Sequence, residues 1–330
     1  MPYPEKLDIV IAGGSLAGLF TAVIIKNLPT VESITILERY QAEQLQDLGA
    51  GIRINDEACD TILEFTGQPP ENYAAWMPTA RFVNKTGEIT LERPAKSWTS
   101  TWAQLYRVLR QSFDADSKCT YRHGCVLQSL VEQDPSTVKV VFRNEQGQDT
   151  SIVAHVVVGA DGASSKARAL MLPETTRTPV GYVLYRGVIA DSELSAASAE
   201  LFGNAGTFHW APSSQVVSYI VPQGKRPANE SQTLVNWVWY QHKSEEDTKK
   251  MLIDKNGVQH RFALPAGGMN AEEVRLIKDK AAKELPAPHA EVIGKTAEPF
   301  VQVVTDSLAG SNIFLDGKIL LVGDAVGGQR

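Results

Sequence analysis

Cysteine is scarce in this chain, which has three thiols, Cys59, Cys119 and Cys125, among 330 residues. Three thiols do not make a disulfide framework. Cys119, His123 and Cys125 lie close together, but no second ligand pair with zinc-finger spacing and no His-Glu-x-x-His motif accompanies them. We therefore predict that the chain has no metal site and that its thiols are buried or idle.

Long hydrophobic runs and positive net charge are also missing. No segment approaches the roughly 18 apolar residues of a membrane-spanning helix, and Met1–Lys6 contains no apolar signal region. The formal net charge of −6 gives no general attraction to nucleic acid and argues only for solubility. We therefore expect a cytoplasmic protein without a nucleic-acid or membrane partner. The composition, 43% hydrophobic and 21% charged, is that of a globular chain that can form two domains or one large one.

One stretch near the N-terminus combines the features of a nucleotide-binding unit. Leu7–Ala12 is short and mostly apolar, as a buried parallel strand should be. A glycine-rich turn, a stretch with apolar residues at helical spacing and a second strand at Ser33–Leu37 follow. Such a turn lets the backbone approach a pyrophosphate, whose charge is met by the N–H groups that open the helix. The predicted turn residues are Gly13, Gly14, Ser15, Ala17 and Gly18.

Two residues refine this prediction. The usual pattern has a glycine at the position of Ser15, whose side chain needs slightly more room. Glu38 follows Gly18 by about 20 residues, where an acid bonds the ribose hydroxyls. Because Glu38 would repel a 2′-phosphate, FAD or NAD fits this site and NADP does not. A tight turn in an α/β domain without a ligand is the alternative.

Two aspartates follow apolar runs later in the chain. Ile152–Ala160 indicates one buried strand, which stops at Asp161 and is followed by small residues. This pattern indicates a second edge of a ligand site, although Asp161 could equally cap the next helix. A further predicted strand, Lys318–Val322, reaches Asp324.

The character of the sequence changes after Pro173. The stretches 180–188, 206–212, 215–221 and 233–240 alternate or are rich in β-forming residues, which predicts an antiparallel sheet in a separate domain. The predicted fold class is α/β, with a Rossmann-like nucleotide-binding domain and a second, mainly antiparallel β-sheet substrate domain. The predicted division is 1–175 for the first domain, 176–299 for the substrate domain and 300–330 for a return to the first, with a hairpin at 79–92 joining the substrate sheet.

Two features leave alternatives open. Trp237 and Trp239 share one face of their strand, either as an aromatic wall of a substrate pocket or as ordinary sheet core. Gly51 either lets the backbone approach a ligand or serves a simple turn.

Three separated segments thus occur together: the glycine-rich turn with Glu38, the segment at Asp161 and the strand that reaches Asp324. As a set, they resemble the flavin-dependent aromatic hydroxylases, the single-component FAD monooxygenases of the para-hydroxybenzoate hydroxylase type, over nearly the whole chain. A closer resemblance is to the 2,6-dihydroxypyridine 3-monooxygenase group, in which serine is usual at the position of Ser15. It rests on the stretches Gly13–Leu19, Leu105–Arg110, Tyr185–Val188, Asn236–Tyr240 and Phe300–Gln302.

The resemblance implies that matching residues bind FAD. Glu38, followed by Arg39 at the same site, would hold the adenosine ribose. Gly51 and Arg107 would contact the flavin or its phosphates, because an arginine can bond pyrophosphate oxygens with two N–H groups. Val126 would place its backbone against the adenine. Asp161 and Gly162 would belong to a motif implicated in both FAD and NAD(P)H binding. Gly323 and Asp324 would bond the ribityl or ribose part of the cofactor.

The resemblance also implies a reaction. NAD(P)H binds transiently and reduces the FAD, and O2 is then used to hydroxylate an electron-rich aromatic or hydroxypyridine-like substrate. The protein orients the ring, helps to deprotonate it and excludes water, so no catalytic triad is expected. Arg186 is the candidate catalytic residue, for pairing with an anionic substrate or an NADPH phosphate, and a surface arginine at a sheet edge is the alternative. A homodimer stays open.

The sequence ends six residues after Asp324, at Arg330. In the enzymes that it resembles, this strand feeds a helix whose N-terminus lies beside the flavin, and further helices complete the FAD domain. We therefore expect a C-terminally truncated family member. The alternative to an active hydroxylase is a catalytically impaired FAD-binding fragment or pseudoenzyme, and the two aspartate segments disfavour an NAD-linked dehydrogenase.

Overall fold

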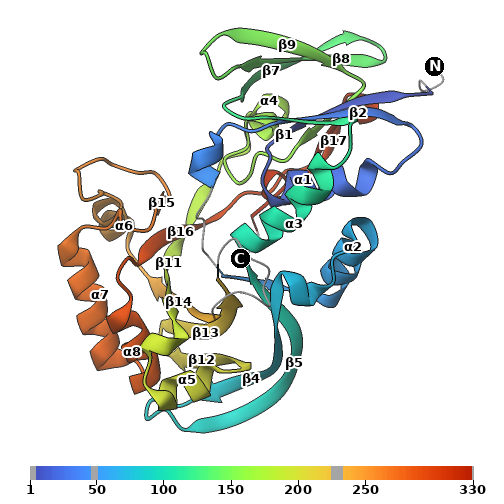
Figure 1. Ribbon diagram of the computed structural model, residues 1–330. Helices are drawn as coiled ribbons and strands as arrows, with labels where there is room; N and C mark the ends of the chain where they lie inside the picture. The colour runs from blue at the N-terminus through green and yellow to red at the C-terminus, as the bar shows by residue number, and fades with distance from the viewer. Residues whose placement is uncertain (1–4, 46–50, 224–232, 329–330) are drawn as a thin grey trace.

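The computed structural model describes residues 5–45, 51–223 and 233–328, which form two lobes (Figure 1). One lobe, at the top of Figure 1, contains a six-stranded and a three-stranded sheet, and the other contains a nine-stranded sheet. The helices are α1 (Leu16–Ile25), α2 (Asp56–Thr66), α3 (Trp102–Asp114), α4 (Lys166–Met171), α5 (Ala196–Phe202), α6 (Glu245–Met251), α7 (Ala271–Glu284) and α8 (Ala287–Lys295).

The strand order of the six-stranded sheet is β17 (Ile313–Phe314), β18 (Ile319–Leu321), β10 (Val156–Gly159), β1 (Leu7–Ala12), β2 (Val31–Leu37) and β6 (Cys119–Arg122). All of its strand pairs are parallel except β17 with β18. The three-stranded antiparallel sheet consists of β7 (Val126–Asp134), β8 (Thr137–Arg143) and β9 (Asp149–Ala154). In β1, Ile9 and Ile11 pack with α1 and α3, whereas Val10 and Ala12 pack with the three-stranded sheet. Because both faces of β1 are covered, its sequence is apolar apart from Asp8 and does not alternate.

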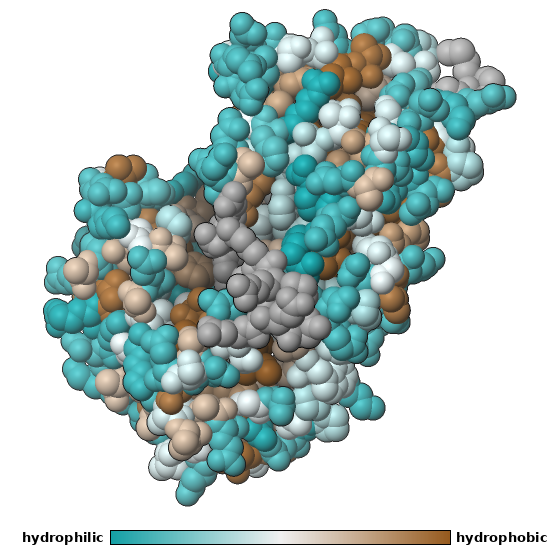
Figure 2. Space-filling model, in the orientation of Figure 1, coloured by the Kyte–Doolittle hydropathy of each residue, from teal (hydrophilic) through white to brown (hydrophobic). Residues whose placement is uncertain are grey.

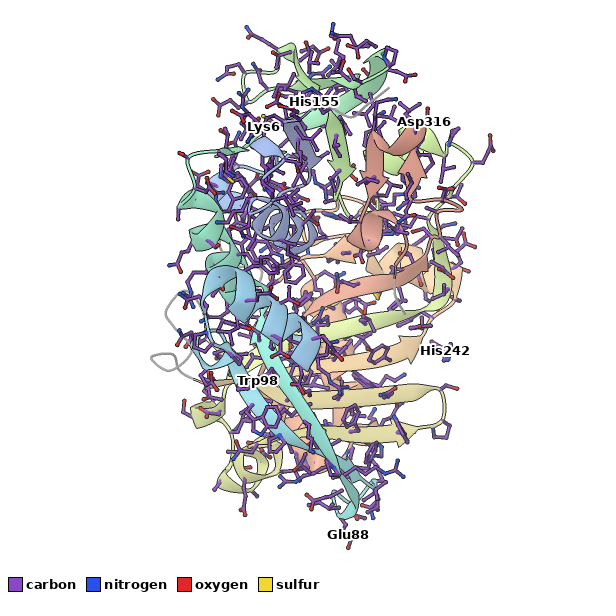
Figure 3. All side chains as sticks on the ribbon, turned by 90° about the vertical axis from the view of Figure 1, so that its right-hand side faces the viewer. Lys6, Glu88, Trp98, His155, His242 and Asp316 are labelled. Carbon is purple, nitrogen blue, oxygen red and sulfur yellow. The ribbon has the colours of Figure 1, made fainter. Side chains whose placement is uncertain are left out.

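The prediction of one strand over 152–160 is wrong. The run is divided between β9 in the antiparallel sheet and β10 in the parallel sheet. The division falls at His155, whose backbone N–H donates to the Asp8 carbonyl and whose Nδ1 accepts from the Asp8 N–H, each at 2.9 Å. These hydrogen bonds fix the corner, near the top of Figure 3, at which the chain changes sheet.

The nine-stranded sheet forms the second lobe. Its pairs are antiparallel except for β12 with β4, which confirms the mainly antiparallel second sheet. The strand order is β15 (Ala263–Leu264), β16 (Phe300–Asp306), β11 (Thr178–Ala190), β14 (Thr233–His242), β13 (Ser214–Pro222), β12 (Ala205–Ala211), β4 (Ala74–Val83), β5 (Ile89–Thr101) and β3 (Gly51–Ile54).

One face of the nine-stranded sheet is core. Trp237 and Trp239 are fully buried there, in a cluster that includes residues of α7 and α8. Their indole N–H groups donate to Thr296 Oγ1 at 2.8 Å and Ser214 Oγ at 2.7 Å. The interpretation of the two tryptophans as ordinary sheet core is therefore confirmed, and the aromatic-wall interpretation is wrong.

The hairpin predicted at 79–92 is present as β4 and β5. It joins the nine-stranded sheet through the pairing of β4 with β12. Glu88 lies at its tip, at the opposite end of the molecule from His155 (Figure 3). Residues 51–101 thus add three strands to a sheet whose other strands come from 178–306. The domain boundaries themselves stay predictions.

Candidate functional site

The glycine-rich turn lies between β1 and α1, against the end of β10. Gly13 has a φ of +109°, and a Cβ atom there would lie 2.3 Å from the carbonyl oxygen of Ala160. Only glycine fits this combination of backbone conformation and close approach. The turn therefore holds its shape through backbone packing against the neighbouring strand.

Gly14 is fixed on both sides by hydrogen bonds. Its N–H donates to Glu38 Oε2 at 2.8 Å, and its carbonyl oxygen accepts from the Tyr121 hydroxyl at 2.9 Å. Tyr121 lies on β6 beneath the guanidinium of Arg110, 3.7 Å from the ring centre. Burial raises the pKa of Tyr121 far above its ordinary value, so its hydroxyl stays a donor. This tyrosine was not among the predicted site residues.

Glu38 directly follows β2 and is almost fully buried, at 4% exposed. Its Oε2 accepts from Gly14 and its Oε1 accepts from the Tyr40 N–H at 2.9 Å. Each carboxylate oxygen has a second lone pair. Glu38 can therefore support the turn and also accept hydrogen bonds from ribose hydroxyls.

Ser15 forms a contact that glycine could not make. Its Oγ accepts a hydrogen bond from the indole Nε1 of Trp102 at 2.9 Å, and Trp102 stacks on Tyr106 with ring centres 4.6 Å apart. The Ser15 side chain forms no capping bond to α1, although the residue occupies the N-cap position. The first N–H groups of α1 are thus left for a ligand.

A cavity of about 250 Å³ opens at the turn. The sequence predicted seven of its lining residues, Gly13, Ser15, Glu38, Arg39, Val126, Asp161 and Gly162, and missed others that include Trp102, Ser164 and Lys166. Trp102, Ser164 and Lys166 lie outside the apolar strand patterns from which the sequence prediction was made. N–H donors at a helix start, a buried acid and open space beside them fit the adenosine and pyrophosphate part of FAD.

Asp161 accepts hydrogen bonds from groups at the start of α4. Its Oδ2 accepts from the N–H groups of Lys166 at 2.7 Å and Ala167 at 3.0 Å, and its Oδ1 accepts from the Ser165 hydroxyl. Ser165 in turn caps the helix through Arg168 N–H. The capping interpretation of Asp161 is therefore confirmed, and its contact with a cofactor stays a prediction.

Arg168 ties the two aspartate segments together. It is 3% exposed and donates to the carbonyl oxygens of Ala163 at 2.6 Å, Ala325 at 2.8 Å and Asp324 at 3.2 Å. Gly323 lies beside α1, because a Cβ there would lie 2.8 Å from the Cβ of Ala17. The last Gly-Asp pair is therefore adjacent to the glycine-rich turn, as the resemblance requires.

Arg107 lies elsewhere. Its Nη2 donates to the Asn72 carbonyl oxygen and to Gln104 Oε1, each at 2.9 Å. It lines a separate cavity of about 470 Å³, which shares Leu45 and Trp102 with the cavity at the turn. Its predicted contact with flavin or phosphate stays a prediction.

Gly51 opens β3 and is held by the nine-stranded sheet. Its N–H donates to Asn236 Oδ1 at 2.9 Å, and its carbonyl oxygen accepts from Arg186 Nη2 at 2.7 Å. A Cβ at Gly51 would lie 2.5 Å from the Asn236 side chain. The glycine is therefore required by close packing against Asn236, and neither alternative for it anticipated this contact.

Arg186 is not a surface residue at a sheet edge, because β11 lies between β14 and β16. Burial lowers the pKa of its guanidinium, while Tyr219 and Tyr240 act in the opposite direction. Its Nη1 donates to Gln302 Oε1 at 3.2 Å, and Tyr219 shares a hydrogen bond with it. Its buried Nε has no hydrogen-bond partner in the part of the chain that the structure describes.

The strand register places these groups on the face opposite the two tryptophans. Arg186 pairs with Val238 of β14 and with Phe300 of β16, and Tyr219 pairs with Asn236. Since paired residues share a face, one side of the sheet carries a group that we call the Arg186 face: Arg186, Tyr219, Asn236, Tyr240, Phe300 and Gln302.

Two further findings concern only the residues that the structure describes. Cys119, His123 and Cys125 belong to no group of three or more His, Cys, Asp or Glu side chains able to hold a metal ion. No helix among these residues is long and apolar enough to cross a membrane. The face in Figure 2 is mainly hydrophilic, with scattered hydrophobic residues.

The chain is similar in sequence and fold to known proteins. A family model described as FAD binding domain-like matches residues 179–306. The chain is 25% identical over 324 residues to 2,6-dihydroxypyridine 3-monooxygenase of Paenarthrobacter nicotinovorans, covering 98% of this chain and 77% of that protein. It is 25% identical over 266 residues to phenazine 1,6-dicarboxylic acid hydroxylase PhzS of Lysobacter antibioticus, covering 72% of this chain and 59% of that protein. The structure of 2,6-dihydroxypyridine-3-hydroxylase from Arthrobacter nicotinovorans matches with a TM-score of 0.85 and 25% identity, covering 98% of this chain and 78% of that chain.

Proposed function

We propose that this chain is a member of the FAD-binding monooxygenase family and that it uses NAD(P)H and O2 to hydroxylate an electron-rich aromatic or hydroxypyridine-like compound. The observation that carries the proposal is the Arg186 face, where a buried cation and two tyrosines meet beside Gly51. Bound FAD would supply the redox chemistry, in which NAD(P)H provides two electrons, one oxygen atom of O2 enters the ring and the other leaves as water.

The proposed FAD contacts follow the cavity at the turn. The N–H groups at the start of α1 meet the pyrophosphate, and Glu38 accepts from the ribose hydroxyls. Arg168 keeps the backbone at Ala163 beside the backbone at Asp324. These residues bind and orient the cofactor, so the proton chemistry falls to the nine-stranded sheet.

Arg186 is proposed to hold the substrate as an anion. A buried guanidinium is costly unless it is paired, and its free Nε offers a donor to a deprotonated ring oxygen. The loss of a ring proton raises the electron density of the ring, which favours attack by an electrophilic oxygen. Pairing with Arg186 would thus both bind the substrate and stabilise its reactive form.

Tyr219 and Tyr240 are proposed to handle the proton. Burial raises the pKa of both hydroxyls, and the Arg186 charge lowers them in part. Both groups are therefore neutral near pH 7 and can donate a hydrogen bond to, or accept one from, a ring substituent. Gln302, bonded to Arg186, keeps the guanidinium plane in place.

The relatives support a heteroaromatic substrate. Their names specify 2,6-dihydroxypyridine and phenazine 1,6-dicarboxylic acid, both nitrogen-containing aromatic rings with acidic groups. A buried arginine on the substrate face is complementary to such acidic groups. We therefore propose a hydroxylated N-heteroaromatic ring as the first class to test.

The first experiment measures flavin content and substrate-stimulated oxidation of NAD(P)H. A yellow protein that releases FAD, and whose NAD(P)H oxidation rises with 2,6-dihydroxypyridine and yields a hydroxylated product, supports the proposal. Bound FAD without turnover for any hydroxypyridine or phenol would favour the catalytically impaired alternative. A protein that cannot be reconstituted with FAD would contradict the proposal.

The second experiment tests Arg186 directly. Arg186→Met should weaken substrate binding at least 100-fold, because it leaves an anion in a buried site without a charge partner, and Arg186→Lys should recover part of the loss. Substrate affinity is read from the change in flavin absorbance, with FAD content as the check on folding. Arg275→Met, on the exposed side of α7, is the matched control and should change neither value. Equal substrate affinity in Arg186→Met and the control would rule out this role.

A further inference from the structure

A large cavity with a concentrated positive charge lies outside the site described above. Its volume is about 700 Å³, and it is formed by the start of β11, the chain from the end of β14 through α6, and the segment that precedes β15. These elements meet beside β16, at the end of the nine-stranded sheet that approaches the upper lobe (Figure 1). None of its lining residues lines the cavity at the glycine-rich turn. We call it the basic cavity.

The charge of the basic cavity contrasts with that of the chain. Its lining has four permanently cationic side chains and one carboxylate, Glu245, in a protein whose formal net charge is −6. Glu245 is paired with Lys249 at 2.7 Å, and His260, also in the lining, is bonded to Asp254 at 2.9 Å. Three cations, Arg177, Lys243 and Arg261, form no ion pair with a carboxylate in the described ranges of the chain.

Two of these cations share one aromatic ring. The guanidinium carbon of Arg177 lies 3.9 Å from the ring centre of Phe262, and that of Arg261 lies 4.8 Å from it. Burial lowers the pKa of Arg177, and the charges of Arg261 and Arg168 add to this against the opposing effect of Asp324. The two guanidinium charges repel each other, and the Arg261 charge lowers the pKa of Arg177 for this reason. An anionic ligand would remove that repulsion.

Arg177 connects the basic cavity with the cofactor site. Its Nη1 donates to Ser164 Oγ at 2.9 Å, and its Nε donates to Thr305 Oγ1 at 2.6 Å. Ser164 also lines the cavity at the glycine-rich turn. A ligand in the basic cavity is therefore one side chain away from the residues that hold FAD.

We propose that the basic cavity binds the adenosine 2′-phosphate end of NADPH and makes the enzyme prefer NADPH to NADH. This inference rests on the proposed function, which requires a nicotinamide dinucleotide to reach the flavin. Glu38 repels a 2′-phosphate at the glycine-rich turn, so such a phosphate needs another site. The four cations supply charge-assisted donors to its dianion, and the ring of Tyr182 supplies an apolar surface for the adenine.

The test measures the binding of adenosine phosphates to the purified flavoprotein by calorimetry. The unmodified protein should bind 2′,5′-ADP at least 10-fold more tightly than 5′-ADP or inorganic phosphate. The double variant Arg261→Gln/Lys243→Gln should lose that difference and keep its FAD content, because neither residue lines the cavity at the turn. Lys280→Gln, an exposed lysine of α7, is the matched control and should behave as the unmodified protein.

Kinetics give a second readout of the same preference. The double variant should raise the KM for NADPH at least 10-fold and change the KM for NADH less than 3-fold. Equal affinity for 2′,5′-ADP and 5′-ADP in the unmodified protein, or 2′,5′-ADP binding that the double variant leaves intact, would overturn the inference. Selective 2′,5′-ADP binding by a protein that hydroxylates no aromatic ring would refute the proposed function and leave the phosphate site standing.

Discussion

The cavity at the glycine-rich turn and the Arg186 face are built in different ways. The turn is held mainly by backbone groups and by Glu38, within the first 38 residues apart from the Ala160 backbone and the side chains of Trp102 and Tyr121. The Arg186 face draws its side chains from four strands between residues 178 and 306. A shape made by the backbone suits a cofactor part common to many enzymes, whereas a face made by side chains can be changed to suit one substrate.

The largest effect is expected from Gly13→Ala. The new Cβ would lie 2.3 Å from a backbone oxygen at a φ of +109°, so strain and overlap together should cost about 4 kcal/mol. FAD affinity should fall below detection while any folded protein remains. Gly294→Ala, in α8 with open space around it, is the control and should keep full FAD content. Thermal unfolding measures the loss of stability, and FAD titration measures the FAD affinity. Normal FAD binding by Gly13→Ala would contradict the role of the turn.

Acid should destabilise the lower lobe through His289. This α8 histidine is fully buried, and its pKa is lowered to about 4, chiefly by burial and also by His209, against the opposing effect of the Thr207 carbonyl. The unfolded chain takes up a proton near pH 6.5, so stability falls as the pH drops from 6.5 to 4, by about 3 kcal/mol in total. Urea unfolding at pH 7 and pH 4.5 should show a smaller difference for His289→Gln than for the unmodified protein. If His289→Gln and the unmodified protein lose the same stability between pH 7 and pH 4.5, His289 is not the cause of the acid destabilisation.

The two faces of β14 can be separated by a pair of aromatic substitutions. Trp237→Phe should lower the free energy of unfolding by about 2 kcal/mol, because it leaves a gap and removes the bond to Thr296, with little change in substrate affinity. Tyr240→Phe should weaken substrate affinity several-fold and change stability by less than about 1 kcal/mol. Denaturant unfolding and flavin absorbance titration distinguish them. The reverse pattern would place the substrate on the tryptophan face.

The smallest effect is expected from Ser15→Ala. It removes the acceptor of the Trp102 indole N–H and should cost about 1 kcal/mol of stability. FAD binding should remain, because the backbone of the turn and Glu38 are unchanged. Trp102 fluorescence should also shift, as its hydrogen bond to the protein is lost. A loss of FAD comparable with that of Gly13→Ala would show that Ser15 acts on the cofactor itself.

The sequence predicted those parts of the site whose contacts are local in the chain. The glycine spacing predicted the turn, and the position of an acid directly after the next strand predicted the role of Glu38. The apolar run at 152–160 did not reveal that His155 divides it between two sheets, because apolarity reports burial without naming the partner strand. Tyr121 and Arg186 were missed or left undecided because their contacts cross 107 and 135 residues.

The path of the chain between the two lobes has a consequence for folding. Residues 51–101 supply β3, β4 and β5 to the nine-stranded sheet, the chain returns to the six-stranded sheet at β6, and 178–306 completes the lower lobe. Neither sheet is encoded by one continuous stretch, so each depends on pairing between strands that are far apart in the chain. The protein should therefore unfold as a single cooperative unit, and a cut between its lobes would leave two pieces that are each missing strands.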